Sequence, residues 1–252
     1  MASKRAAAVP IRVVILTLDA HLAGAFEAAR ARLARQVPGL SLSMHLSADW
    51  MRDPAAGARA VADIEKADII CNMMLFTEEQ AAAVLPALRA RRDHCDALVS
   101  CLCTPEVMQL TRLGRFSMGG GEERSAWSPI SLLKKLRGKR EDGGTAGERQ
   151  MTMLRQLPKL LRFVPGPAQD VRTWLLCMSY WLGATDANLS SMIAMLINRY
   201  AQGPRAALKG ALDVDAVADP LDAAVIHFSE PIEDQLEWAL LPPAVGSVVA
   251  RP

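Results

Sequence analysis

The sequence predicts an α/β fold: a flavodoxin-like parallel sheet domain followed by a mostly helical domain. Short apolar runs alternate with Ala- and Arg-rich segments of helical character between residues 11 and 103. This order of strands and helices is typical of a parallel sheet with helices on both faces. After residue 148 the apolar residues recur mainly with the 3.6-residue period of a helix.

Four strands and three helices are expected in the first domain, which we place at residues 10–118. The run 11–18 is continuously apolar, as in a buried strand, whereas 40–46 alternates as a half-exposed edge strand does. The other strands are expected at 67–74 and 96–103, and the helices at 20–35, 55–65 and 78–92.

The rest of the chain divides by composition into three parts. Residues 119–147 are rich in glycine and charge, which predicts a flexible basic loop and linker. Residues 148–205 are expected to form the helical domain, and 206–252 a linker and the truncated start of a larger domain.

The helical domain is expected to contain an antiparallel helix pair. One apolar stripe runs from Val171 to Leu182 and a second from Leu189 to Tyr200. Gly183 fits the end of the first helix, and Thr185 or Asp186 can cap the second.

The composition narrows the functional classes. Hydrophobic residues make up 51% of the chain, as in a globular protein, and 29 Lys and Arg nearly balance 27 Asp and Glu. A net charge so near zero gives no overall positive electrostatic field that would favour binding of nucleic acid. Five cysteines without a CxxC pair indicate a reduced, cytoplasmic protein. The first apolar run is too short for a signal peptide, and no apolar segment reaches the roughly 20 residues of a membrane span.

Nucleotide and metal motifs are absent from the sequence. Neither GxGxxG nor GxxxxGK[ST] occurs, so ATP binding by this chain is not expected. The four histidines are scattered and the cysteines form no paired ligand motif, so no metal site is expected.

Polar residues gather where the predicted strands end. Asp19 and His21 follow the first strand, Asn72 lies near the end of the third, and Thr104 and Glu106 follow the fourth. Such turns converge at the ligand crevice of an open α/β sheet, so a small polar pocket is one interpretation. The simpler interpretation, which we favour, is that Asp19 caps the next helix and His21 lies on its surface.

A basic run occupies the middle of the chain: Lys134, Lys135, Arg137, Lys139 and Arg140. Apolar residues at every third position beside it suggest an amphipathic segment that contacts an anionic membrane or a partner. The other interpretation, which we favour, is a solvated helix edge beside a linker.

Aromatic residues of the helical region allow two interpretations. Trp174, Tyr180 and Trp181 lie with Met178 at helical spacing, and they could form a cradle for a tetrapyrrole. Stripes of this kind more often belong to a core, which is the interpretation we favour.

Several short segments, in the same order, resemble the amino-terminal region of the magnesium chelatase H subunit family. The first are RVVILTLDAHLAGA and ADIICNMMLFTEEQ, followed by Pro105–Met108, Leu113-Gly114, Phe116–Met118, Leu157–Lys159, Ala168–Asp170, Trp181–Gly183 and Asn188-Leu189. The resemblance covers roughly residues 10–200, and an ordered set of matches is more specific than one motif.

The resemblance implies a part in ATP-dependent insertion of Mg²⁺ into protoporphyrin IX during chlorophyll or bacteriochlorophyll synthesis. In this family the H subunit holds the porphyrin, and the AAA+ partners, the I and D subunits, use the ATP. The residues that could face the crevice or the porphyrin are Asp19, His21, Asn72, Pro105, Glu106, Met108, Phe116 and Met118.

Members of the family are far longer than this chain. The residues that bind porphyrin and metal are therefore expected beyond residue 252, and the chain alone is expected to bind no cofactor and to be inactive. The short length is consistent with a fragment, a truncated copy or a shortened paralogue of a family member. Two alternatives are a non-catalytic module that contacts partners or a membrane peripherally, and a flavodoxin-like domain that binds an unrelated small molecule.

Overall fold

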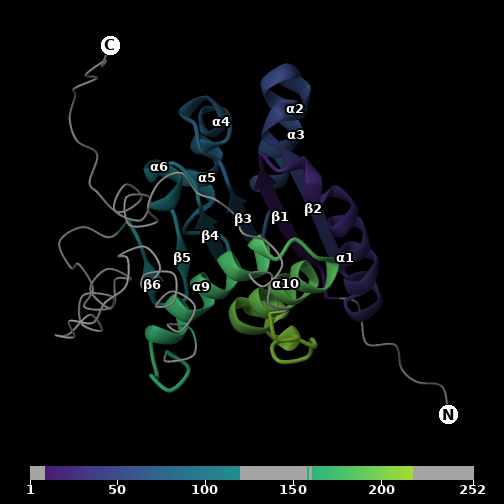
Figure 1. The fold of residues 1–252 in the computed structure, drawn as a ribbon, viewed down its shortest axis with the longest axis vertical. Coiled ribbons are helices and arrows are strands. Elements are labelled where there is room, and N and C mark those ends of the chain that lie inside the picture. Colours follow the sequence, from purple (N-terminus) through teal and green to yellow (C-terminus); the bar gives the residue numbers. More distant parts are fainter. Residues whose placement is uncertain (1–8, 120–157, 159–160, 218–252) are drawn as a thin grey trace, which may run out of the picture.

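The fold is that of a computed structural model, which describes residues 9–119, 158 and 161–217. The predictions for residues 120–157, including the basic run, and for residues 218–252 lie outside the described residues. The described part is a central sheet with helices on both faces, as the sequence predicts (Figure 1).

Six strands form the sheet in the order β2-β1-β3-β4-β5-β6. The first four are parallel, with the strand order of a flavodoxin-like sheet, whereas β5 and β6 pair antiparallel. The strands are β1 (Ile11–Thr17), β2 (Leu40–Leu46), β3 (Ile69–Met73), β4 (Ala97–Cys101), β5 (Arg112–Leu113) and β6 (Phe116–Ser117). All four predicted strands are confirmed, with β2 at the edge. The sheet is nevertheless mixed, because β5 and β6 pair antiparallel. The sequence does not predict these two strands, since two residues are too few to show a period.

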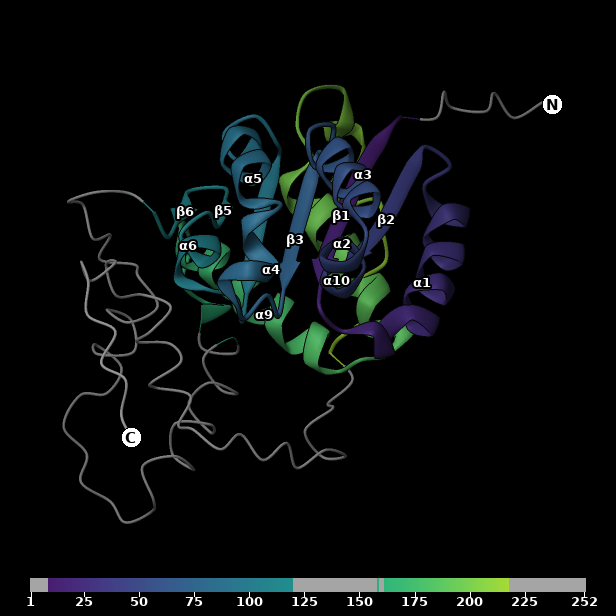
Figure 2. The same ribbon diagram turned by 90° about the horizontal axis from the view of Figure 1, so that it is seen from above.

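The helices divide between the two faces of the sheet. From β1 the chain crosses to β2 on one side and then returns past β1 to β3 and β4. Right-handed crossovers therefore place α1 (Ala23–Gln36) on one face and α3 (Pro54–Ile64) and α5 (Leu85–Arg91) on the other. The helices α9 (Ala168–Leu182) and α10 (Asp186–Tyr200) pack against each other, and α10 packs on α1 (Figures 1 and 2).

Short helices follow the strands at one edge of the sheet. They are η1 (Ala20–Leu22), α2 (Ser47–Arg52), α4 (Glu78–Ala82) and α6 (Pro105–Met108). A further short helix, η2 (Gly203–Leu208), follows α10 and not a strand. The predicted helix at 78–92 is divided into α4 and α5, because Pro86 lacks the N–H that a continuous helix needs there. We call the end of the sheet at which the parallel strands finish, with α2, α4 and α6, the carboxyl edge. The opposite end, at which these strands begin, is the amino edge.

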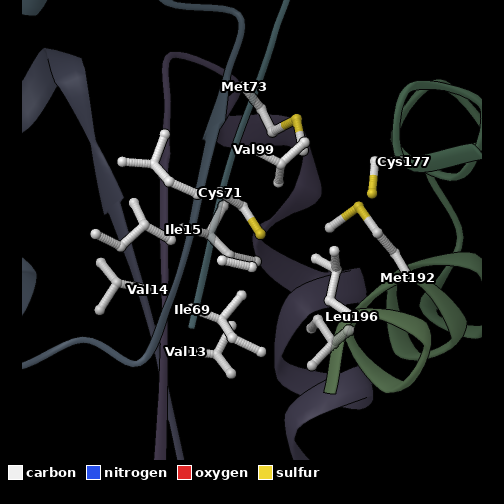
Figure 3. Packing of buried hydrophobic residues seen from close by; sticks show 14 of the residues in the cluster. Val13, Val14, Ile15, Ile69, Cys71, Met73, Val99, Cys177, Met192 and Leu196 are labelled. Atoms are coloured by element: carbon white, nitrogen blue, oxygen red, sulfur yellow. The ribbon is translucent and has the colours of Figure 1, made fainter. Parts of the chain in front are cut away.

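The core lies between the sheet and the α9–α10 pair. Alternate side chains of the strands, among them Ile15 and Cys71, point toward Met192 and Leu196 of α10, whereas Val14 points to the other face (Figure 3). Trp174 and Trp181 are no more than 2% exposed. The Nε1 of Trp174 donates a hydrogen bond of 2.9 Å to the carbonyl oxygen of Ser100 in β4. The aromatic stripe is therefore core, and α9 and α10 share one hydrophobic core with the sheet.

Local signals in the sequence fix where the helices begin. Asp53 caps α3 and Pro54 opens it, since the first turn of a helix needs no N–H from proline. Thr77 and Gln80 form a reciprocal capping box at α4. Thr185 caps α10 by accepting the N–H of Asn188, which resolves the two predicted caps in favour of Thr185.

Candidate functional site

The carboxyl end of β1 bears Asp19 and His21. Asp19 Oδ1 accepts the backbone N–H of His21 at 2.9 Å, and the Asp19 N–H is in turn bound by Thr17 Oγ1. His21 is exposed on η1. The structure thus shows the favoured interpretation, a helix cap and a surface histidine, and the two side chains do not form an acid–base pair.

Asn72 lies inside the sheet rather than in an open crevice. It is 0% exposed, and its Nδ2 donates to Ser100 Oγ on the neighbouring strand at 3.0 Å. Its Oδ1 and the Oγ1 of buried Thr104 have no hydrogen-bond partner within the described residues. Buried polar atoms of this kind are typically satisfied by an internal water. Asn72 is therefore not placed with Asp19 and His21.

The chain turns sharply after β3 and after β4. Met74 and Leu102 adopt left-handed backbone conformations, with φ of 59° and 55°, which are rare for residues other than glycine. The Met74 N–H donates to the Cys101 carbonyl, so the two turns are adjacent. The indole N–H of Trp181 donates to Met74 Sδ at 3.4 Å, so a buried tryptophan of α9 supports this strained backbone.

Residues 105–117, which include several of the predicted crevice residues, fold into α6 and the β5–β6 hairpin. Pro105 and Glu106 open α6 at the carboxyl edge and are partly exposed. Met108 and Phe116 are 2% and 4% exposed, so they belong to the core, and Met118 is partly buried against it. Of these residues, Glu106 alone presents an ionisable group at the carboxyl edge.

The hairpin is clamped to the helical pair by one carboxylate. Asp170, in the first turn of α9, accepts the backbone N–H of Arg115 at 3.0 Å and the hydroxyl of Tyr200 at 2.9 Å. Gly114, between β5 and β6, has a φ of +56°, and a Cβ there would lie 2.8 Å from Asp170 Oδ2. Burial raises the pKa of Tyr200, which keeps its hydroxyl a donor. We call Gly114, Arg115, Asp170 and Tyr200 the clamp.

A second polar cluster joins the end of the helical region to the amino edge. Arg205 of η2 donates from Nε and Nη2 to the two oxygens of Asp96, each at 2.9 Å, and lies 3.3 Å from Asp68. Asp68 and Asp96 directly precede β3 and β4, and both are buried. The Asp96 hydrogen bonds raise the pKa of Arg205, against the effect of its partial burial. This ion cluster and the clamp both lie at the amino edge.

The cysteines are buried and carry no evident chemistry. All five thiols are free and buried, and burial raises the pKa of Cys71 and of Cys103 to about 12. A thiol that stays protonated is a poor nucleophile and a poor metal ligand. No group of three His, Cys, Asp or Glu side chains in the described part is arranged to hold a metal ion. A search of the same residues for a helix long and apolar enough to cross a membrane finds none.

The structure separates the predicted site residues into three groups. Asp19, His21, Pro105 and Glu106 lie at the carboxyl edge, whereas Asn72, Met108 and Phe116 belong to the interior and Met118 is partly buried against it. The basic residues Lys134, Lys135, Arg137, Lys139 and Arg140 lie outside the described residues.

Sequence reasoning missed the roles of two carboxylates. Asp170 belongs to a quoted family segment, but its partner Arg115 is 55 residues away and nothing in the spacing links them. Asp96 could have been noticed as a charge directly before a buried strand, where it must be paired.

The clamp also brings together segments that lie far apart in the sequence. Leu113-Gly114 and Ala168–Asp170 are separate matches in the sequence, and the structure brings Gly114 of the hairpin next to Asp170 of α9.

Residues 12–175 match the family described as Domain of unknown function (DUF3479). The chain is 46% identical over 188 residues to the magnesium-chelatase H subunit of Cereibacter sphaeroides, and 44% identical over 189 residues to that of Rhodobacter capsulatus. Each alignment covers 75% of this chain. It is 32% identical over 239 residues, 90% of its length, to the chloroplastic magnesium-chelatase subunit ChlH of Oryza sativa subsp. indica. The alignments cover only 15% to 16% of these relatives. The chain therefore belongs to the DUF3479 family, and its similarity is to the amino-terminal region of the magnesium-chelatase H subunit.

Proposed function

We propose that the chain serves as the amino-terminal part of a magnesium chelatase H subunit. In this role it would support the insertion of Mg²⁺ into protoporphyrin IX in chlorophyll or bacteriochlorophyll synthesis. The observation that carries the proposal is 46% identity over 188 residues to a protein named as a magnesium-chelatase H subunit. The porphyrin and Mg²⁺ are substrates of the assembled enzyme, and ATP is used by its partners, the I and D subunits.

The part played by these residues is supporting rather than catalytic. The clamp and the ion cluster join sheet, hairpin and helical pair into one unit. The described thiols are buried, and burial raises the pKa of each one, so they are poor metal ligands. We therefore propose that the chain alone does not insert metal, and that it presents its carboxyl edge, with Glu106 and His21, toward the remainder of the H subunit.

A domain exchange tests the proposal. The matching region of the Cereibacter sphaeroides H subunit is replaced by this chain, and magnesium porphyrin formation is followed by fluorescence with the I and D subunits, ATP and Mg²⁺. The proposal expects the chimera to retain activity within about tenfold of the parent, a loss of about 1.4 kcal/mol in transition-state stabilisation. A chimera that folds and binds porphyrin but forms no product would contradict it.

Porphyrin contact by the chain itself is tested separately. The full 252-residue chain is titrated into deuteroporphyrin while absorbance and fluorescence are recorded. A spectral change that Glu106→Gln weakens would support a porphyrin contact at the carboxyl edge. An unchanged spectrum at micromolar porphyrin would remove direct contact from the proposal and leave only the supporting role.

A further inference from the structure

The loop before α9 holds an aromatic side chain in solvent. Phe163 is 82% exposed, more than Met51, Phe76 and Val214, the other large hydrophobic residues exposed in the described part. Isolated exposed hydrophobic residues are ordinary, so the exposure alone decides nothing. What distinguishes Phe163 is the way its loop is held and what surrounds it.

The loop is fixed by side chains of α9. The amide of Gln169 donates to the carbonyl oxygens of Leu161 and Val164, at 2.5 and 2.6 Å, on both sides of Phe163. Arg172 donates from Nε to the carbonyl oxygen of Pro158 at 2.8 Å. An exposed aromatic ring on a prearranged loop loses little conformational entropy when it is buried by a partner. In Figure 1 the segment that leads into α9 extends beyond the sheet at the amino edge.

Three guanidinium groups lie around this loop. Arg162 precedes Phe163 and is exposed, Arg172 belongs to α9, and Arg199 belongs to α10. Partial burial lowers the pKa of Arg172, and the nearby charges of Arg199 and Arg162 lower it further. None of the three forms an ion pair with a carboxylate of the described residues. The nearby carboxylate of Asp170 is already engaged by Arg115 and Tyr200. Like charges gathered without counter-charges are complementary to an anionic partner.

We propose that Arg162, Phe163, Arg172 and Arg199 form a contact surface for an anionic membrane. An exposed ring on this loop can enter the headgroup region, and guanidinium groups beside it bind lipid phosphates. Each arginine near an anionic bilayer contributes about 1 kcal/mol, so several are needed beside one aromatic residue for measurable binding. A segment that extends beyond the sheet favours a lipid surface over a protein pocket, which would have to enclose the ring.

Vesicle binding of the full chain tests this surface. The chain is sedimented with vesicles of phosphatidylcholine alone and of phosphatidylcholine mixed with phosphatidylglycerol. Binding to the mixed vesicles is expected, with roughly fivefold weaker partitioning for each positive charge removed. Arg162→Glu should weaken binding roughly tenfold or more, because it replaces attraction by repulsion, and Phe163→Ser should weaken it to a similar extent.

Matched variants at distant positions provide the controls. Phe76→Ser removes a ring that is 50% exposed at the carboxyl edge, and Arg89→Glu reverses an exposed charge on α5. Both should bind as the unaltered chain does, and circular dichroism should show that all four variants fold. The basic run Lys134–Arg140 is unchanged in every variant, so differences between them belong to the altered positions.

The outcomes separate clearly. Loss of binding in Arg162→Glu and Phe163→Ser, with both controls retained, supports the surface. Equal binding by all variants overturns the proposal, as does failure of the chain to prefer anionic vesicles. Retention on heparin without vesicle binding would also overturn it, because it would identify a soluble polyanion as the partner. The domain-exchange assay contains no membrane, so the proposed function stands or falls independently.

Discussion

The polar contacts at the two edges of the central sheet differ in how far apart their partners lie in the sequence. At the carboxyl edge a long-range hydrogen bond joins Trp181 to Met74, 107 residues apart, but the polar contacts that cap the helices are local: Asp19 binds the N–H of His21, and Thr77 pairs with Gln80. At the amino edge they span long distances in the sequence, 55 residues from Arg115 to Asp170 and 109 from Asp96 to Arg205.

This difference teaches where stability and function can be separated. The amino edge attaches the helical pair to the sheet, so changes there should unfold or loosen the whole described unit. The local caps at the carboxyl edge stabilise one helix turn each, so a change in one of these caps should cost less stability than a change in the amino-edge contacts. Ligands of open α/β sheets bind in the crevice outside the carboxyl ends of the strands.

The largest effect is expected from Arg205→Ala. It leaves the buried carboxylates of Asp68 and Asp96 without their cation, which should lower the free energy of unfolding by about 3 kcal/mol. Urea denaturation followed by tryptophan fluorescence measures it. Arg30→Ala is the matched control, because its pair with Glu27 is exposed and should contribute less than about 1 kcal/mol. Equal losses in the two variants would mean that the buried ion cluster contributes no more to stability than an exposed ion pair.

Asp170→Ala should have the next largest effect. The N–H of Arg115 and the hydroxyl of Tyr200 lose a charged acceptor, which should cost about 2 kcal/mol. Hydrogen exchange should show faster opening of the amides at 112–118, with little change in α4. If α4 and the hairpin open together, the clamp is not a local link between hairpin and helices.

Gly114→Ala tests the clamp from its other side. The substitution should cost about 1–2 kcal/mol, because alanine is disfavoured at a φ of +56° and its Cβ would crowd Asp170. In the Asp170→Ala background the crowding disappears, so the second loss should be smaller than the first. Strict additivity in this double-mutant cycle would mean that backbone conformation alone explains the glycine.

Thr77→Ala should have a smaller effect at the carboxyl edge. It removes one half of the capping box of α4 and should cost about 1 kcal/mol, without altering exchange in the hairpin. A loss as large as that of Arg205→Ala would show that the carboxyl edge also supports the whole fold.

The smallest effect on stability is expected from Glu106→Gln. The carboxylate is partly exposed and makes no hydrogen bond or ion pair with described residues, so the free energy of unfolding should change by less than about 0.5 kcal/mol. In the chimeric H subunit the same change should lower magnesium porphyrin formation if this edge faces the porphyrin site. Unchanged activity would move the functional surface elsewhere.

The sequence reveals elements whose signal is local and repeated. The apolar run of β1 and the alternation of β2 predict a buried strand and an edge strand, and both are found there. Asp19 and Thr185 act as the caps that their positions suggest. The strands β5 and β6 escape prediction because two residues contain no period, and their pairing depends on β4 and the clamp.

The sequence by itself determined the parallel α/β arrangement, the helical pair and the family, because periodicity, caps and ordered segments are written along the chain. Tertiary structure alone decided that Asn72 and Met108 are interior, since burial depends on which helices cover each face of the sheet. It also decided that Asp170 and Arg205 bind residues far away in the sequence. Such contacts follow from the packing of α9 and α10 on the sheet, and no spacing along the chain encodes them.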